Sequence, residues 1–290
     1  MTTTETDLYQ RICVRRPYFA FADLATDEPG TASATIPAEV PTAGTEPINL
    51  HEFIRHGAIL GLCSVASLAP PDERRYYLAQ VGTVAWLTPP HQRTISGPLS
   101  GYAHGTMIST RRGAADVTAW GDGKPILKLT VEFSVFSEKA FGRMFSHTHR
   151  PDLDYTTPDT SPYINGLELE DRTIRDDKTA SATVTATPEQ CAGHFNGFPA
   201  MPVAVIIRAA VELGAYLVNT RETGHLWEPA DGDLHGVTQL VPAGRPVTML
   251  AELIHATPTS RLVRVGFTVD GSGIGHITFQ YAPTEEGNGQ

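Results

Sequence analysis

Apolar residues recurring at intervals of three and four predict two buried helices in this chain. The first pattern covers residues 48–66 and the second covers residues 203–218. The second segment is apolar on nearly every side, which is typical of a helix enclosed by a protein core. Pro202 precedes it, and proline suits a helix start because the N–H that it lacks would have no partner there. The positions are Leu50, Phe53, Ile54, Gly57, Ala58, Gly61, Leu62 and Val65, and then Val203, Ile206, Ile207, Ala210, Val211, Gly214 and Leu217.

Shorter runs rich in β-branched and aromatic residues predict strands around both helices. Residues 1–8 are expected to form a frayed tail. The sequence Gly121-Asp-Gly123 predicts the turn of a hairpin. The expected strands cover 12–14, 18–21, 31–36, 76–87, 100–110, 115–120 and 126–136 in the first half, and 179–184, 237–242 and 274–281 in the second.

The two halves of the chain repeat each other, which indicates a duplicated α+β unit. Thr179-Ala-Ser-Ala-Thr-Val184 matches Thr31-Ala-Ser-Ala-Thr-Ile36 almost letter for letter, and a predicted helix follows each copy. The segment 237–242 is similar to 84–89 in the same way. We therefore expect an N-terminal repeat at 10–150, a linker at 151–163 and a C-terminal repeat at 164–284.

Composition narrows the range of partners. The formal net charge is −10 over 290 residues, which disfavours nucleic acid and anionic membranes as partners. The sequence has no apolar run of membrane-spanning length and no signal-peptide pattern at its start. Its three cysteines, an odd number without a Cys-x-x-Cys pair, predict a reduced cytoplasmic protein without structural zinc.

The loop before the second helix carries the most specific motif, His194-Phe195-x-Gly197-x-Pro199-x-Met201-Pro202. It resembles the loop-to-helix signature of the bacterial 3-hydroxyacyl-thioester dehydratases. Those enzymes have the hot-dog fold, a curved antiparallel sheet wrapped around one long helix. The resemblance, together with the internal repeat, implies a double hot-dog and an acyl-thioester site at His194. A hydrogen-bonded structural histidine is the alternative role.

The resemblance also implies a catalytic acid fourteen residues after the histidine, where this chain has Arg208. Superposing the apolar positions of the two helices places Glu52 opposite Arg208. A composite site then pairs His194, the base that removes the C2 proton, with Glu52, the acid that protonates the leaving hydroxyl. Glu212 is the expected partner of Arg208 in an inactive second site. The structural alternative for Glu52 is a first-turn glutamate that complements the helix dipole.

Further residues are expected around a bound thioester. The backbone N–H groups of Ile48 and Asn49 would stabilise the thioester oxygen, and His56 completes the helix motif of the family. Gly197 allows close backbone approach between the rings of Phe195 and Phe198, with Pro199 completing the loop. Small side chains are expected to leave room for the acyl chain between the helices: Gly57, Ala58, Gly61 and Gly214.

A second resemblance, to the A-factor (γ-butyrolactone) biosynthesis protein family, rests on the double repeat, on Glu52-x-x-x-His56 and on Phe136–Met144. It implies transfer of a 3-oxoacyl group from a carrier protein. A non-catalytic acyl-binding protein is the third possibility. Each alternative implies an acyl carrier protein or a coenzyme A thioester as partner, no cofactor and no metal. The chain is expected to be a monomeric pseudo-dimer or a homodimer.

Overall fold

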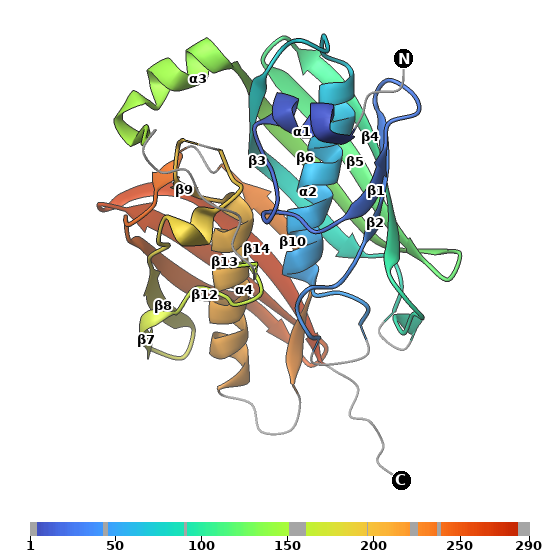
Figure 1. Ribbon diagram of the computed structural model, residues 1–290. Helices are drawn as coiled ribbons and strands as arrows, with labels where there is room; N and C mark the ends of the chain where they lie inside the picture. The colour runs from blue at the N-terminus through green and yellow to red at the C-terminus, as the bar shows by residue number, and fades with distance from the viewer. Residues whose placement is uncertain are drawn as a thin grey trace.

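The computed structural model describes residues 5–42, 46–89, 92–150, 161–195, 197–220, 226–236 and 239–283. Its principal element is a twelve-stranded sheet in which every pair of neighbours is antiparallel (Figure 1). The first half of the chain forms α1 (Glu5–Ile12), β1 (Ala22–Ala25), β2 (Thr31–Ile36), α2 (Leu50–Ser67), β3 (Arg75–Trp86), β4 (Leu99–Ser109), β5 (Arg112–Gly121), β6 (Lys124–Ser137), α3 (Glu138–Met144) and the 3-10 turn η2 (Ser146–Thr148).

In the second half, as in the first, two strands of the large sheet precede a long helix and further strands follow it, whereas α1, α3 and η2 have no counterpart among its described elements. This half forms β7 (Glu170–Ile174), β8 (Thr179–Val184), η3 (Glu189–Cys191), β9 (Ala200–Met201), α4 (Val203–Asn219), β10 (Trp227–His235), β11 (Val241–Pro242), β12 (Val247–Thr257), β13 (Ser260–Val269) and β14 (Ser272–Pro283). The short strands β9 and β11 pair with each other in a separate two-stranded sheet.

The strand order of the large sheet is symmetric about its centre. It runs β1-β2-β4-β5-β6-β3 in one half and β10-β14-β13-β12-β8-β7 in the other, so equivalent strands occupy mirrored places. The halves join where β3 pairs with β10 in antiparallel register, with Gly82 opposite Leu234. Helices α2 and α4 lie on the same face of this sheet and contact each other (Figure 1).

Glycine brings each central helix close to the sheet. Helix α2 begins at Leu50 and α4 at Val203, so Gly61 and Gly214 are both the twelfth residue of their helix. A Cβ on Gly61 would lie 2.9 Å from the Cβ of Ala115, and one on Gly214 would lie 2.2 Å from the hydroxyl of Tyr281. These two glycines therefore serve helix–sheet packing, and the expectation that they leave room for an acyl chain was wrong.

The N-terminal segment differs from the sequence prediction. Residues 5–12 form α1 rather than a tail, and residues 18–21 are not a strand. Leu8 and Ile12 are buried, and the guanidinium of Arg11 donates to the carbonyls of Ala66 and Ala69 at 2.7 Å each. Ala66 lies in the last turn of α2 and Ala69 just beyond it, so Arg11 ties α1 to the C-terminal end of α2. The contact explains why a polar-looking segment is ordered.

Two further differences concern the connections between elements. Of the strand predicted at 237–242, residues 241–242 form β11 and residues 237–238 lie outside the described residues. The strand beside β3 in the large sheet is β10. Of the expected linker 151–163, residues 151–160 also lie outside the described residues. Helix α3 was not predicted; its N-cap Ser137 accepts a hydrogen bond from the N–H of Ala140. Among the described helices, none is long and apolar enough to span a membrane.

Candidate active site

The loop that carries His194 is held by the N-terminal segment. The N–H of Arg15 donates to the carbonyl of Gly193 at 2.8 Å, and Val14 forms an isolated antiparallel bridge with His194. Gly193 has φ +80°, and a Cβ there would lie 2.3 Å from the carbonyl oxygen of Arg15. Only glycine fits this close approach at a left-handed backbone position.

The environment of His194 favours the neutral form of its imidazole. Burial lowers the pKa of His194 to about 4, although a hydrogen bond to Ala200 opposes the shift. Nδ1 lies 3.2 Å from the carbonyl oxygen of Ala200, so the neutral ring donates its N–H there. Nε2 is then left with a lone pair and has no hydrogen-bond partner among the described residues. The ring lies between those of Phe195 and Tyr18, at centroid distances of 4.0 and 4.9 Å.

His194 lines an apolar pocket between the two central helices and the middle of the sheet. The walls come from α2, α4, β3 and β10, with Val14 and Tyr18 from the N-terminal segment. Among the described lining residues there is no Asp, Glu, Lys or Arg. The lining residues on the two helices are Ile54, Ala58, Ile59 and Leu62 of α2 and Val203, Ala204, Ile206 and Ile207 of α4. Such a pocket suits an aliphatic chain with one polar end beside His194.

Glu52 faces a different and smaller pocket. Its side chain is 1% exposed, and its two carboxylate oxygens accept the backbone N–H groups of Glu39 at 2.5 Å and Val40 at 3.3 Å. Pro162, Tyr163 and residues 165–167 line the smaller pocket. Ala204 is the single described residue that lines both pockets. The structure therefore does not bring Glu52 and His194 to one pocket.

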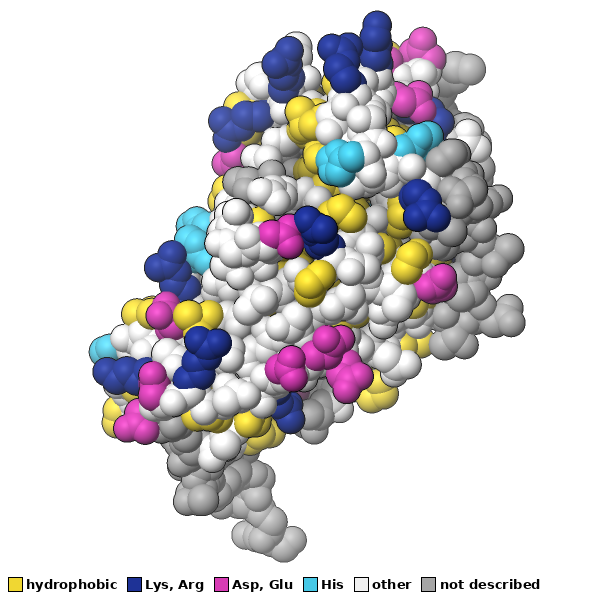
Figure 2. All heavy atoms as spheres, turned by 90° about the vertical axis from the view of Figure 1, so that its left-hand side faces the viewer, with side chains coloured by type: hydrophobic (Ala, Val, Ile, Leu, Met, Phe, Trp, Pro, Cys, Tyr) yellow, Lys and Arg dark blue, Asp and Glu magenta, His cyan; other side chains and the backbone are white. Residues whose placement is uncertain are grey.

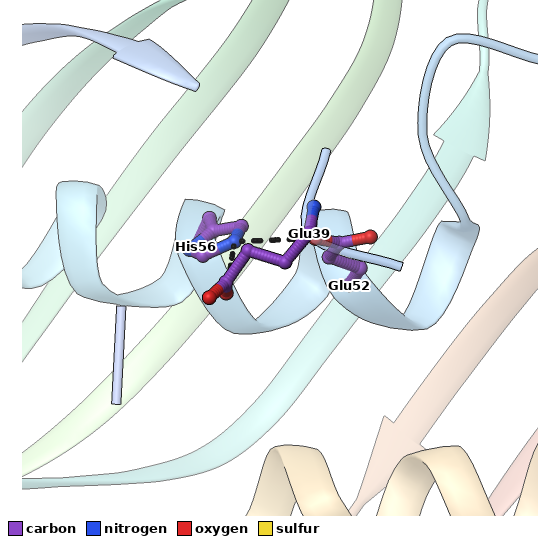
Figure 3. A group of neighbouring side chains, drawn as sticks. All are labelled: Glu39, Glu52 and His56. Carbon is purple, nitrogen blue, oxygen red and sulfur yellow. Dashed lines mark hydrogen bonds and ion pairs between the residues drawn. The ribbon is translucent and has the colours of Figure 1, made fainter. Parts of the chain in front are cut away.

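Glu52 belongs to a charge cluster with Glu39 and His56, which Figure 3 draws, and with Arg55. Nε2 of His56 lies 3.4 Å from Glu39 and 3.6 Å from Glu52, and the guanidinium of Arg55 donates to Glu39 at 2.5 Å. Burial alone would raise the pKa of Glu39, but the hydrogen bond from His56 and the charge and hydrogen bond of Arg55 lower it to about 2.

Glu39, Glu52 and His56 of this cluster are the one group of described residues whose side chains could together hold a metal ion. Their ligand atoms all lie within 4.8 Å of one another. Nδ1 of His56 accepts the backbone N–H of Ala20 at 3.3 Å, which places the proton of the neutral ring on Nε2. That proton faces the two carboxylates, and Arg55 already neutralises one of them. The donor set therefore fits a charge network better than a metal centre.

The helix positions also change the predicted superposition. Arg55 and Arg208 are each the sixth residue of their helix, whereas the sequence superposition placed Glu52 opposite Arg208. Arg55 donates to the carbonyl of Tyr18 at 2.7 Å, and Arg208 donates to the carbonyl of Tyr163 at 2.8 Å. Both repeats thus carry arginine at the position where the dehydratase pattern has its acid. The expected ion pair of Arg208 with Glu212 is present at 2.9 Å.

The other predicted contact residues divide between the pocket and its surroundings. Phe195 lines the pocket of His194. Phe198 packs on Phe141 and His149 outside it, at centroid distances of 5.1 and 4.7 Å. The remaining predicted residues do not line this pocket. The carbonyls of Gly197 and Pro199 accept the backbone N–H groups of Arg150 and Ala243. The side-chain amide of Asn49 donates to the carbonyl of Val40, and Ile48 and His56 are fully buried.

Tyr18 and Val14 line the pocket although sequence reasoning did not select them. The one sequence feature that could have pointed to them is the aromatic run around Tyr18, and it was interpreted as a strand. Nothing in their spacing connects them with His194, because the contact joins segments that are far apart in the sequence.

Comparisons with known proteins identify solved structures that have a similar fold. No protein-family model and no curated protein matches the chain. A structure described as an oleoyl thioesterase from Lactobacillus plantarum is 12% identical with a TM-score of 0.60, covering 90% of this chain and 99% of its own. The tesB protein of Mycobacterium avium subspecies paratuberculosis is 10% identical with a TM-score of 0.56, covering 91% and 96%.

A third solved structure is described by its fold rather than by an activity. It is a hot-dog protein of unknown function from Alicyclobacillus acidocaldarius, 13% identical, with a TM-score of 0.55 and coverage of 98% and 99%. At these identities the likeness establishes architecture only. This protein has a hot-dog fold.

Proposed function

We propose that this protein is an acyl-thioester enzyme and that hydrolysis is its reaction. The observation that carries the proposal is a neutral histidine at an apolar pocket whose described lining has no acid. Hydrolysis needs a base to activate water, and the departing thiolate recovers the same proton. Two of the similar solved structures are described as a thioesterase or a tesB protein, which supports this choice.

The pocket supplies the other parts that hydrolysis requires. Its apolar walls would hold the acyl chain, with the thioester next to Nε2 of His194. Val203 and Ala204 line the pocket at the start of α4, where backbone N–H groups lack intrahelical acceptors. These groups and the positive end of the helix dipole would stabilise the oxyanion that forms on the thioester carbonyl.

We further propose that the chain is a double hot-dog whose repeats meet at β3 and β10. The symmetric strand order and the equal positions of Gly61 and Gly214 in their helices support the duplication. The boundaries 10–150 and 164–284 remain predictions. In this arrangement one chain supplies both halves of the interface at which the pocket lies.

Dehydration of a 3-hydroxyacyl thioester is the second candidate. One observation favours it: the pocket of Glu52 adjoins that of His194 through Ala204. A shift of the Tyr18 and Tyr163 rings would have to join the two pockets before Glu52 could protonate a leaving hydroxyl. The carboxylate would also have to release the N–H groups of Glu39 and Val40, which makes this the less favoured reaction.

The carrier of the acyl group would approach beside α3. Phe141 of α3 packs on Phe195 at a centroid distance of 5.2 Å, so this helix borders the His194 loop. Its exposed residues include Lys139 and Arg143, and Figure 2 shows Lys and Arg side chains at the upper end of this face. A positive surface in an acidic protein suits the phosphates of coenzyme A or an acidic carrier protein.

Incubation with acyl thioesters, read by intact mass, tests the proposal. The set would contain saturated, 3-hydroxyacyl and 3-oxoacyl chains on coenzyme A and on carrier protein. Free acid and free thiol indicate hydrolysis, a loss of 18 mass units with the thioester intact indicates dehydration, and acyl transfer to an added alcohol indicates an acyltransferase. His194→Gln should lower hydrolysis by about 10² or more. Binding without any turnover would overturn an enzymatic function.

A further inference from the structure

Tyr18 brings a phenol hydroxyl to the pocket of His194. The side chain lines this pocket and is 4% exposed, and its ring lies 4.9 Å from that of His194. Its hydroxyl makes no hydrogen bond with any described residue. The hydroxyl is also absent from the set of unbonded polar atoms that are fully buried. The hydroxyl therefore keeps some accessible surface on a side chain that lines this pocket.

Arg55 and Tyr163 hold Tyr18 in position. Nη1 of Arg55 donates to the backbone carbonyl of Tyr18 at 2.7 Å. The ring packs edge to face on Tyr163 at 5.2 Å, and the hydroxyl of Tyr163 donates to the carbonyl of Ala192 at 2.7 Å. A donor held in this way needs little rearrangement when charge develops on a substrate.

Tyr18 differs from the other buried tyrosines. The hydroxyls of Tyr163 and Tyr281 are engaged with the carbonyls of Ala192 and Val211. Tyr77 also lines the pocket but packs on Phe133 in the sheet, with no ring contact to His194. Burial raises the pKa of Tyr18, so that it stays a protonated donor throughout the neutral range.

We propose that the hydroxyl of Tyr18 donates a hydrogen bond to the thioester carbonyl oxygen while His194 activates water. Nε2 of His194 takes a proton from water as its oxygen attacks the carbonyl carbon, and the oxyanion accepts the Tyr18 hydrogen bond. The C–S bond then breaks, and the sulfur leaves with the proton from His194. Tyr18 keeps its proton. This role rests on the proposed hydrolysis and takes the place of the donors to the thioester oxygen that were expected at the backbone N–H groups of Ile48 and Asn49.

Tyr18→Phe removes the hydroxyl and keeps the ring. We expect kcat to fall by about 10- to 10³-fold, as is typical for loss of one oxyanion donor, with KM rising no more than several-fold and the acid limb of the pH profile unchanged. Tyr281→Phe removes a buried tyrosine hydroxyl that lies outside this pocket, so it is the control and should retain kcat. Full kcat in Tyr18→Phe, with His194→Gln inactive, would overturn the role of Tyr18 and leave the proposed hydrolysis standing.

A binding measurement separates the two proposals. The probe is a coenzyme A thioether whose sulfur-bound methylene carries a ketone. It keeps the carbonyl oxygen but has no thioester bond that could be cleaved. Tyr18→Phe should bind this ketone several-fold more weakly than the wild type and should bind a simple alkyl thioether equally well. Equal affinity for the ketone, or an equal loss for both ligands, contradicts the hydrogen bond even if the wild type hydrolyses nothing.

If Tyr18→Phe does not fold, a fluorinated tyrosine at position 18 keeps both ring and hydroxyl and makes the phenol more acidic. A more acidic phenol is a stronger hydrogen-bond donor, so the affinity for the ketone should rise relative to that for the alkyl thioether. An unchanged ratio of the two affinities would count against the donor role.

Discussion

Glu52 accepts the backbone N–H of Glu39 in a hydrogen bond of 2.5 Å. The donor lies in the loop that leads from β2 to α2, and the acceptor lies in the first turn of α2. The second oxygen accepts the N–H of Val40, so the carboxylate ties the loop to the helix start. Glu52 therefore has a structural task that its sequence position, taken alone, did not reveal.

Glu52→Gln should consequently affect stability more than turnover. The amide retains one acceptor and loses the charge, and one backbone N–H is left without a carboxylate. The free energy of unfolding, measured in urea, should fall by about 1–3 kcal/mol, while kcat for hydrolysis stays within a few-fold of the wild type. A loss of 10² or more in kcat with unchanged unfolding would instead favour Glu52 as the catalytic acid.

Stability should fall as the pH is lowered. The pKa of His194 is about 4 in the fold against 6.5 for an ordinary histidine, so its contribution is complete above pH 6.5 and is lost as the pH falls towards 4. The pKa of Glu39 is about 2 against 4.5, so its contribution is complete above 4.5 and is lost towards 2. Urea midpoints at pH 7.5, 5.5 and 4.5 measure the first window.

His194→Gln is the control for that window, because glutamine does not titrate. The variant should lose less stability than the wild type between pH 7.5 and 4.5, by on the order of 1 kcal/mol. An identical pH dependence in both proteins would show that His194 does not have a lowered pKa in the fold.

Gly193→Ala should disturb the catalytic loop. An added Cβ would meet the carbonyl oxygen of Arg15 at 2.3 Å, and the backbone has φ +80°. Gly123 is a matched control, because it has φ +74° and nothing within 4 Å of an added Cβ. We expect Gly193→Ala to lower kcat by about 10-fold or more, since a displaced base loses alignment, whereas Gly123→Ala costs only about 1 kcal/mol of stability. Equal effects of the two changes on kcat would contradict the docking of this loop on residues 14–15.

Ala58→Leu should discriminate among acyl chains by length. Ala58 lines the pocket of His194, whereas Gly61 on the same helix packs on the sheet. The larger side chain should lower kcat/KM for a long acyl thioester by about 10-fold more than for a four-carbon one. Gly61→Ala, in contrast, should lower the melting temperature and leave the ratio of the two kcat/KM values unchanged. A uniform loss with Ala58→Leu would mean that the acyl chain lies elsewhere.

Local pattern was sufficient for the two long helices and for most strands of the first half. Apolar spacing predicted α2 and α4 to within two residues, and alternation predicted β2 and β8 at their observed bounds. The repeated Thr-Ala-Ser-Ala-Thr motif indicated two equivalent units, and the His194 motif placed a loop directly before α4. Each of these features depends on neighbours in the chain, because side-chain periodicity follows from the backbone geometry of a single element.

The register between the repeats required the tertiary structure. The sequence superposition was displaced by three residues, which rotates a helix by about 300° and is nearly one full turn. On helices that are apolar on almost every side, such a displacement still aligns apolar positions with apolar positions. The observed helix starts pair Arg55 with Arg208 and leave no acid at the expected place.

What surrounds His194 was likewise decided by the fold. Tyr18 and Val14 reach the pocket because the N-terminal segment crosses to the His194 loop and bonds to Gly193. Glu52 turns to the loop at Glu39 because two backbone N–H groups there need an acceptor. The sequence by itself determined the elements and the histidine; long-range packing and the satisfaction of buried polar groups determined which side chains share its pocket, since neither depends on spacing along the chain.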